Sequence, residues 1–188
     1  MKKEIKKQIE RKNKKLIDYS WILKITLMAF IISMVFSSIS ETTIPKANVF
    51  ISIIILIIFI IIGIVFDMIG VAVTSADEEP FHSMSSRKVN GAKTAVKLKK
   101  NADKTASFCN DVIGDICGII SGCVGASISV SIAIKFNIPI FVSSLFVTSI
   151  IASLTIGGKA IFKSIAINKS NEILYSFAKI IDLFIKNK

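Results

Sequence analysis

Residues that carry most enzyme chemistry are scarce in this sequence. It contains one histidine, three cysteines and one tryptophan among 188 residues. There is no HExxH motif, no phosphate-binding loop, no CxxC pair and no recognisable pairing of a nucleophile with a base. The sequence therefore gives no positive argument for an enzyme. We expect His82 to be an interfacial side chain, not a ligand or a pH switch.

The cysteines are also too far apart to act together. Cys109, Cys117 and Cys123 are eight and then six residues apart. On a helix, neighbours at these spacings lie about 12 and 9 Å apart along the axis. Such distances exclude a disulfide within one helix and a shared metal ion. We interpret the three cysteines as small packing residues in a reducing or lipid environment.

Charge is absent from one long stretch, because residues 49–66 contain no charged side chain. Hydrophobic residues make up 52% of the sequence, which is too apolar for an ordinary soluble domain. A charge-free run of about eighteen residues approaches the thickness of a bilayer. The sequence therefore predicts an all-α membrane protein.

Four apolar runs are long enough to span a bilayer, and they predict a four-span transmembrane domain over residues 19–158. Short connections at 40–47 and 135–139 suit the outer side of the membrane. The pair Gly157 and Gly158 is expected to end or loosen the fourth span. The four runs cover residues 21–39, 49–66, 106–134 and 140–156.

Basic residues fall in blocks beside the apolar runs and give a formal net charge of +11. Nine Lys and Arg residues lie in 1–24, seven in 76–105 and six in 159–188, against one in each outer connection. This asymmetry predicts a multi-pass protein of the inner (plasma) membrane with both termini cytoplasmic. It indicates contact with the lipid bilayer and no binding of nucleic acid.

Three amphipathic segments are expected to lie in the plane of the cytoplasmic surface. Residues 1–18 predict a basic helix and residues 79–104 predict a second one, with Pro80 in its first turn. Residues 159–188 predict an amphipathic C-terminal helix that follows a break within 167–171.

Polar residues in the third apolar run are the main functional signal. Asn110, Asp111 and Asp115 lie in a segment apolar enough to enter a bilayer. Asp111 and Asp115 are four residues apart, so a helix places them on one face. Carboxylates at membrane depth are costly and mark either an ion path or a structural polar pair. Small residues recur beside them at every fourth position, which lets another helix approach closely. These are Gly114, Gly118, Gly122 and Ala126.

Two interpretations of these polar residues remain open. Carboxylate, amide and hydroxyl oxygens suit hard cations such as Mg²⁺ and Na⁺, and Asp67, Thr74 and Ser75 extend the set of oxygen ligands. In the alternative, the carboxylates pair with Lys159 or Lys163, or bond serines across the bundle.

The order of these elements resembles the transmembrane domain of the CNNM/CorC magnesium transporters, without the CBS domains that usually follow it. The family patterns read roughly SGSE-TAL, then GNN-LVN, then GE-x-x-PK. The resemblance covers about residues 48–188. Its matching segments are S-A-D-E at 75–78, N-D at 110–111, G-K-A-I-F-K at 158–163 and N-E at 171–172.

This resemblance implies a homodimer that holds Mg²⁺ between helices, with Na⁺ as the coupling ion. Ser75 matches the first serine of SGSE, and Asn110 matches the first asparagine of GNN. Asp111 stands where a second asparagine is usual, unless a one-residue shift brings Asp111 and Asp115 into the first and last asparagine positions. The expected metal ligands are therefore Ser75, Asn110, Asp111 and Asp115.

Two functions follow, and they differ in the role of Lys159, which occupies the acidic position of GE-x-x-PK. In the first, the protein binds or moves a divalent cation, Mg²⁺, by alternating exposure of the site between helices. In the second, it is a non-transporting membrane subunit or scaffold. There, Lys159 neutralises Asp111 or Asp115, and the small residues bind a separate membrane or regulatory partner.

Overall fold

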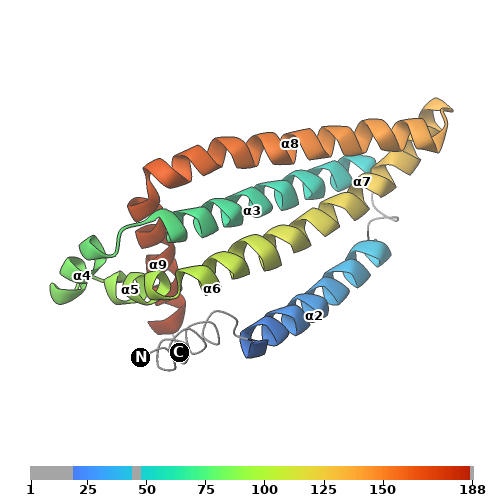
Figure 1. Cartoon of the computed structure of the whole chain (residues 1–188). Coiled ribbons are helices and arrows are strands. Elements are labelled where there is room, and N and C mark those ends of the chain that lie inside the picture. The colour runs from blue at the N-terminus through green and yellow to red at the C-terminus, as the bar shows by residue number, and fades with distance from the viewer. Residues whose placement is uncertain (1–18, 44–47, 187–188) are drawn as a thin grey trace, which may run out of the picture.

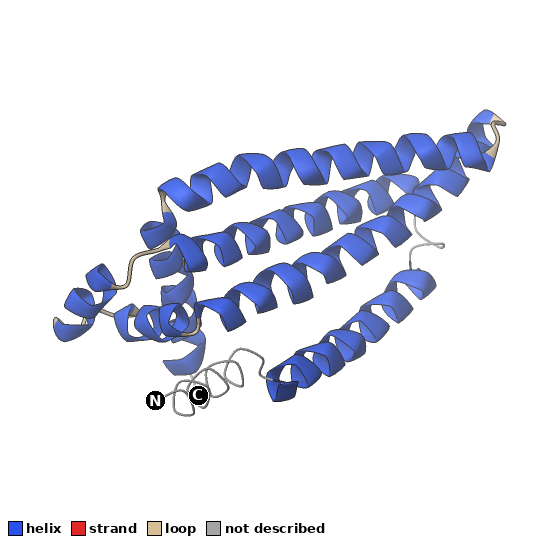
Figure 2. Cartoon of the chain, in the orientation of Figure 1, coloured by secondary structure: helices blue, strands red, loops and turns tan. Residues whose placement is uncertain are grey.

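All regular elements in the computed structural model, which describes residues 19–43 and 48–186, are helices (Figure 2). The predicted all-α fold is confirmed for these residues. The basic helix predicted for residues 1–18 lies outside the described ranges.

Three helical runs are long and apolar enough to cross a membrane. They are α3 (Val49–Ser75), α8 (Ile140–Asn168) and a continuous run from Ala102 to Phe136. This continuous run consists of α6 (Ala102–Ser107), η2 (Phe108–Gly114) and α7 (Asp115–Phe136). The helix α2 (Tyr19–Thr43) has an apolar part, Tyr19–Val35, that is shorter than these three. The described residues therefore have helical membrane-protein character, with three candidate spans.

The three candidate spans lie side by side with roughly aligned axes, and α2 lies beside α7 (Figure 1). Their shared core consists almost wholly of branched aliphatic side chains, which fill the space between α3, α7 and α8. Helix α2 adds Ile25, Ala29 and Ile32 at the edge of this core. The buried members are Leu56, Ile60, Ile64, Val112, Ile116, Ile120, Val124, Ile128 and Val147.

The outer surface of the bundle is apolar, as expected for contact with lipid. Helix α8 buries few residues, while Phe141, Phe146 and Ile156 on it are each exposed by more than 65%. Soluble monomers rarely expose such large contiguous apolar areas. A polar bond joins two helices in the interior, where the buried Ser143 Oγ of α8 donates to the Ser129 carbonyl of α7 at 2.8 Å.

Three shorter helices gather at the end of the bundle where α3 ends (Figure 1). We call them the end cap: α4 (Glu79–Ser86), α5 (Ala92–Lys100) and α9 (Ser170–Lys186). A second core holds them against the end of α3 and the start of the continuous run from Ala102 to Phe136. It contains Ile69, Val73, Ala76, Phe81, Ala95, Cys109, Leu174 and Ala178.

Polar contacts fix the end cap to the last turn of α3. The Lys99 ammonium donates to the carbonyls of Val73 and Thr74 at 3.2 and 2.8 Å. These carbonyls lie at the negative end of the helix dipole, where a cation is favourable. The Asp77 N–H also donates to Asn171 Oδ1 at 2.9 Å, which joins the start of α9 to the residues that follow α3.

Two predicted helix boundaries differ from the structure. The helix predicted over 79–104 is divided, because the chain turns between α4 and α5 at Lys88 and Gly91, which have φ values of 55° and 82°. Helix α8 continues through Gly157 and Gly158, where an end was expected. Packing outweighs the weak helix propensity of glycine there, since the Ile64 side chain occupies the space beside Gly158. The predicted break within 167–171 is confirmed at Lys169.

Candidate functional site

The polar segment predicted from the sequence adopts a π-helical turn. Residues Phe108–Gly114 form this wider turn between α6 and α7, and it contains Asn110 and Asp111. π-Helical turns occur mostly as single turns inside α-helices, frequently at functional sites. The two residues differ in environment, because Asn110 is partly buried and Asp111 is exposed.

The Asn110 side chain packs directly against Gly70 of α3. Its Oδ1 is buried and has no hydrogen-bond partner among the described residues. A Cβ atom at Gly70 would lie 2.6 Å from Asn110 Cγ, so only glycine leaves room for the amide. An unpaired buried polar atom costs about 1–3 kcal/mol. This segment of the bundle therefore holds a polar group at a cost in stability.

The register of α3 against the continuous run from Ala102 to Phe136 places the predicted ligands at different positions along the helix axes. Gly63 packs on Cys117 and Gly70 on Asn110, so these antiparallel helices bring Ser75 level with residue 105. At helical rise, Ser75 lies about 15 Å along the axis from Asp115. Ser75, Asn110, Asp111 and Asp115 therefore do not form one coordination sphere. Within residues 19–43 and 48–186, no group of three or more His, Cys, Asp or Glu residues could hold a metal ion.

A cavity of about 460 Å³ lies between α3, α7 and α8, and of the four predicted ligands only Asp115 lines it. We call it the bundle cavity. Three further polar side chains line it, from α7 and α8, and most of its remaining wall consists of apolar side chains and glycines. The polar lining residues are Asp115, Ser121, Thr155 and Lys159, and the larger apolar ones are Phe59, Ile60 and Ile119.

Lys159 forms an ion pair with Asp67 beside the bundle cavity. Lys159 Nζ lies 3.3 Å from Asp67 Oδ1, and their side chains are 33% and 20% exposed. The hypothesis that Lys159 neutralises Asp111 or Asp115 is wrong in its choice of partner, because α3 brings Asp67 to the lysine instead. Asp115 has no ion-pair partner in the described part of the chain. The cavity region therefore carries one uncompensated negative charge.

Two hydroxyl groups in the bundle cavity differ in their availability to a ligand. Thr155 Oγ1 donates to the Ile151 carbonyl at 2.8 Å, so its proton is already used within α8. Ser121 is only 3% exposed, and its Oγ has no hydrogen-bond partner among the described residues. Because the Oγ atom itself is buried, a ligand in the cavity would reach this hydroxyl only after rotation of the Ser121 side chain. The position of Ser121 beside the cavity is not predictable from the sequence, because a single serine in an apolar run carries no distinguishing signal.

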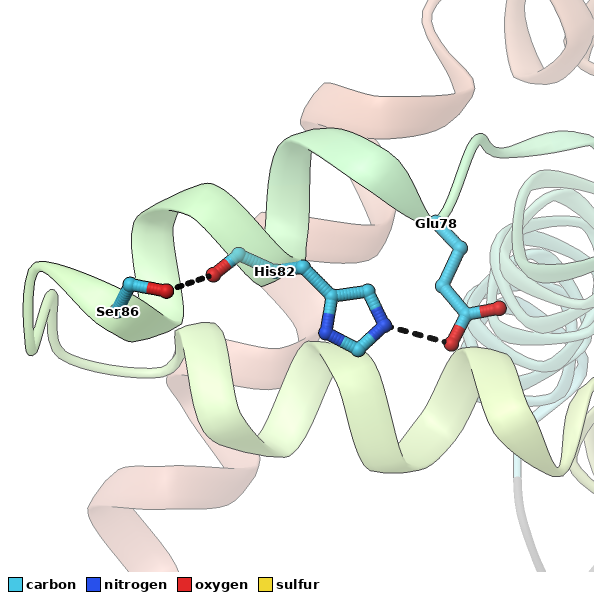
Figure 3. Close-up of polar contacts among 3 residues, drawn as sticks. All are labelled: Glu78, His82 and Ser86. Carbon is cyan, nitrogen blue, oxygen red and sulfur yellow. Dashed lines mark hydrogen bonds and ion pairs between the residues drawn. The ribbon is translucent and has the colours of Figure 1, made fainter.

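The only histidine lies on the end cap, away from the bundle cavity. His82 Nε2 contacts Glu78 Oε1 at 2.9 Å, one turn earlier on the chain, and Ser86 Oγ donates to the His82 carbonyl at 2.9 Å (Figure 3). Both side chains of the His82–Glu78 pair are exposed. This arrangement is a local contact at the surface of α4.

The three cysteines are free thiols and serve as packing residues. Cys109 is buried in the second core, Cys117 is buried against Gly63, and Cys123 is half-buried. Their interpretation as packing residues is confirmed for Cys109 and Cys117, and all three are free thiols.

Comparisons of this chain with known protein families, curated proteins and solved structures give no match. Functional inference therefore depends on the bundle cavity and its charges.

Proposed function

We propose that this protein is a four-span membrane protein that binds a cation at Asp115 in the bundle cavity and moves it across the membrane. The observation that carries this proposal is the charge balance around the cavity. Lys159 is paired with Asp67 at 3.3 Å, so the Asp115 carboxylate is left to attract a cation. A carboxylate that faces a cavity between spans is the usual mark of an ion path.

The depth of the charged residues supports entry from the cytoplasmic side. With residues 137–139 at the outer surface, Asp67, Lys159 and Asp115 lie about 27–32 Å from the outer ends of their helices. This distance matches the inner edge of a hydrocarbon layer about 30 Å thick. Ser121 and Thr155 lie deeper, about 23 Å from the outer ends. The cavity would then extend from the inner edge toward the middle of the membrane.

The outer half of the bundle would form the closed gate in this state. Ile128 of α7 and Val147 of α8 are buried there in the shared core. Alternating exposure requires these side chains to separate while the cytoplasmic side closes around the bound cation. Small shifts of packed helices of this kind are a common form of switching.

Mg²⁺ is the transported ion that the CNNM/CorC resemblance implies, with Na⁺ as the coupling ion. The bundle cavity suits a cation that keeps part of its hydration shell, because one carboxylate faces a volume of about 460 Å³. Mg²⁺ is commonly held in this way, by one or two carboxylates and several waters. The Lys159 ammonium opposes a divalent ion, so Lys159→Glu is expected to strengthen Mg²⁺ binding.

The end cap would lie on the cytoplasmic surface, with both termini on that side of an inner (plasma) membrane. The exposed basic side chains of Arg87, Lys93, Lys97 and Lys100 on or beside α4 and α5 support contact with anionic lipid. Helix α2 would be the fourth span, packed on α7. A homodimer is the assembly that the family resemblance implies.

The second candidate function is a non-transporting subunit that binds a partner helix. It is favoured by the small-residue face of α7, because a Cβ atom at Gly118 or Gly122 would meet no atom within 4 Å. A face of this kind allows close approach of another helix. In this alternative the Asp67–Lys159 pair is purely structural.

A titration of thermal stability tests the cation site. The purified protein in detergent is titrated with MgCl₂ and, separately, with NaCl at constant ionic strength. Binding to the folded state alone stabilises it by about 2.7 kcal/mol at a hundredfold excess over the Kd. We expect saturable stabilisation in the wild type and its loss in Asp115→Asn.

Asp111→Asn is the matched control, since Asp111 lies one turn away, is exposed as Asp115 is, and does not line the bundle cavity. It is expected to bind like the wild type. Equal loss in both variants, or no saturable shift in the wild type with either salt, would contradict the site. A positive result leads to flux measurements in liposomes with the same variants.

A further inference from the structure

The bundle cavity is larger and more apolar than an inorganic ion requires. Its volume of about 460 Å³ lies within the range of about 300–1,000 Å³ that is typical of small-molecule pockets. Phe59 and Ile60 from α3 and Ile119 from α7 supply apolar wall. A hydrated metal ion needs only the carboxylate and the room, whereas such a wall would in addition stabilise the body of an organic molecule by burying apolar surface.

The polar groups of the cavity are separated in a way that specifies the two ends of a ligand. Asp115 and Ser121 lie six residues apart on α7, which is about 9 Å along the helix axis. One small ion cannot contact both groups at that separation. A molecule with a cationic end, an apolar middle and a hydrogen-bonding end would contact both.

We propose that the bundle cavity binds a hydrophobic organic amine in its protonated form. This inference deepens the proposed function, since it rests on the same cation site at Asp115. The ammonium donates to the Asp115 carboxylate, the apolar body lies against Phe59 and Ile119, and a polar group at the far end bonds Ser121 Oγ. Ser121 lines the cavity and its buried hydroxyl has no partner among the described residues, so a rotation of this side chain toward the ligand would give the hydroxyl a partner; this is the second, independent feature that points to a ligand.

The electrostatics favour a singly charged ligand over a doubly charged one. Asp67, Asp115 and Lys159 together carry a net charge of −1, so one positive charge neutralises the cavity region. An alkylammonium also sheds water more easily than Mg²⁺, which dehydrates reluctantly. The Asp67–Lys159 pair stays intact when such a ligand binds, so no internal charge has to be displaced.

Three related probes separate the two contacts. Tyramine has an ammonium at one end and a phenolic hydroxyl at the other. 2-Phenylethylamine lacks the hydroxyl, and 4-ethylphenol lacks the ammonium. Each is titrated by isothermal calorimetry into the full chain in lipid-free detergent micelles, and the heat measured with empty micelles is subtracted.

We expect saturable 1:1 binding of tyramine and weaker binding of 2-phenylethylamine, by about fivefold, the effect of one hydrogen bond. 4-Ethylphenol should show no saturable binding. Asp115→Asn should weaken both amines at least tenfold, while Asp111→Asn should not. Ser121→Ala should weaken tyramine to the level of 2-phenylethylamine and leave 2-phenylethylamine unchanged. Thermal unfolding of each variant verifies that it is folded.

Two results would overturn the inference: amine binding that survives Asp115→Asn, or a Ser121→Ala effect that is equal for both amines. The metal titration distinguishes this failure from failure of the proposed function. Stabilisation by Mg²⁺ or Na⁺ that depends on Asp115, without amine binding, removes the organic ligand and keeps the ion site. Amine binding that depends on Asp115, without any effect of the salts, supports the amine and removes the inorganic ion.

Discussion

Separate removal of the two charges in the Asp67–Lys159 pair should destabilise the bundle, and their joint removal should restore most of the loss. Lys159→Met keeps the length and apolar body of the lysine, and Asp67→Asn keeps the shape of the carboxylate. Each single variant leaves the other charge without its partner at 3.3 Å. The double variant leaves a neutral pair in the same space.

The magnitude follows from the distance and the exposure of the pair. Two unit charges at 3.3 Å attract by about 5 kcal/mol at an effective dielectric constant of 20. The side chains are 33% and 20% exposed, so solvent screening and the regained hydration of the lone charge reduce the net effect. We expect each single variant to lose about 1–3 kcal/mol of unfolding free energy, less than the 3–5 kcal/mol typical of fully buried pairs.

The assay is reversible unfolding in mixed detergent micelles, analysed as a double-mutant cycle. The expected coupling energy is about 1–3 kcal/mol, in the direction that makes the double variant more stable than the sum of its parts predicts. Lys163→Met is the matched control, because Lys163 lies one turn further along α8, is exposed and forms no ion pair with a described residue. Additive effects of Lys159→Met and Asp67→Asn would refute the claim that the pair neutralises itself and leaves Asp115 to a cation.

Two further predictions concern the packing of α3. Gly70→Ala should destabilise the protein by about 1–3 kcal/mol through overpacking against Asn110, and Asn110→Ala in the same chain should relieve it. Gly118→Ala, in open space, should be neutral or stabilising by up to about 1 kcal/mol in the same unfolding assay, because alanine favours a helix more than glycine does. If Gly118→Ala were destabilised and Gly70→Ala were tolerated, the packing of Gly70 on Asn110 would be contradicted. Lys99→Met should cost about 1–2 kcal/mol and speed amide exchange in the end cap, because two carbonyls at the end of α3 lose their ammonium donor, while the exposed Lys100→Met should change neither.

Much of the fold was predictable because apolar length and charge distribution are strong signals. The charge-free run at 49–66 lies within α3, and the break before the last helix lies at Lys169 as expected. The division of the helix predicted over 79–104 was not predictable from periodicity. That periodicity continues across Gly91, whose φ of 82° marks the turn only when the packing of α5 on α9 is known.

The candidate site was predictable in its residue types and less so in its partners. Asp111 and Asp115 share a helical face by spacing, yet only Asp115 lines the bundle cavity. The partner of Lys159 depends on which helix lies beside α8, and spacing within one helix carries no such information. For the same reason Ser121 could not be selected from the serines of the apolar runs.

The position of the Asp67–Lys159 pair has a consequence for how the protein is made. The two residues are separated by 92 positions, so α3, if it spans the membrane as proposed, would enter it long before its counter-charge on α8 has been synthesised. A carboxylate near the middle of a span would hold α3 back at that stage, since charges there cost about 2.5–3.5 kcal/mol during insertion. In the proposed orientation Asp67 lies close to the inner edge, where it would remain hydrated until α8 arrives. The orientation proposed above would thus allow each helix to insert in turn, and the late pairing of the two charges would then hold α8 against α3 as the last step of assembly.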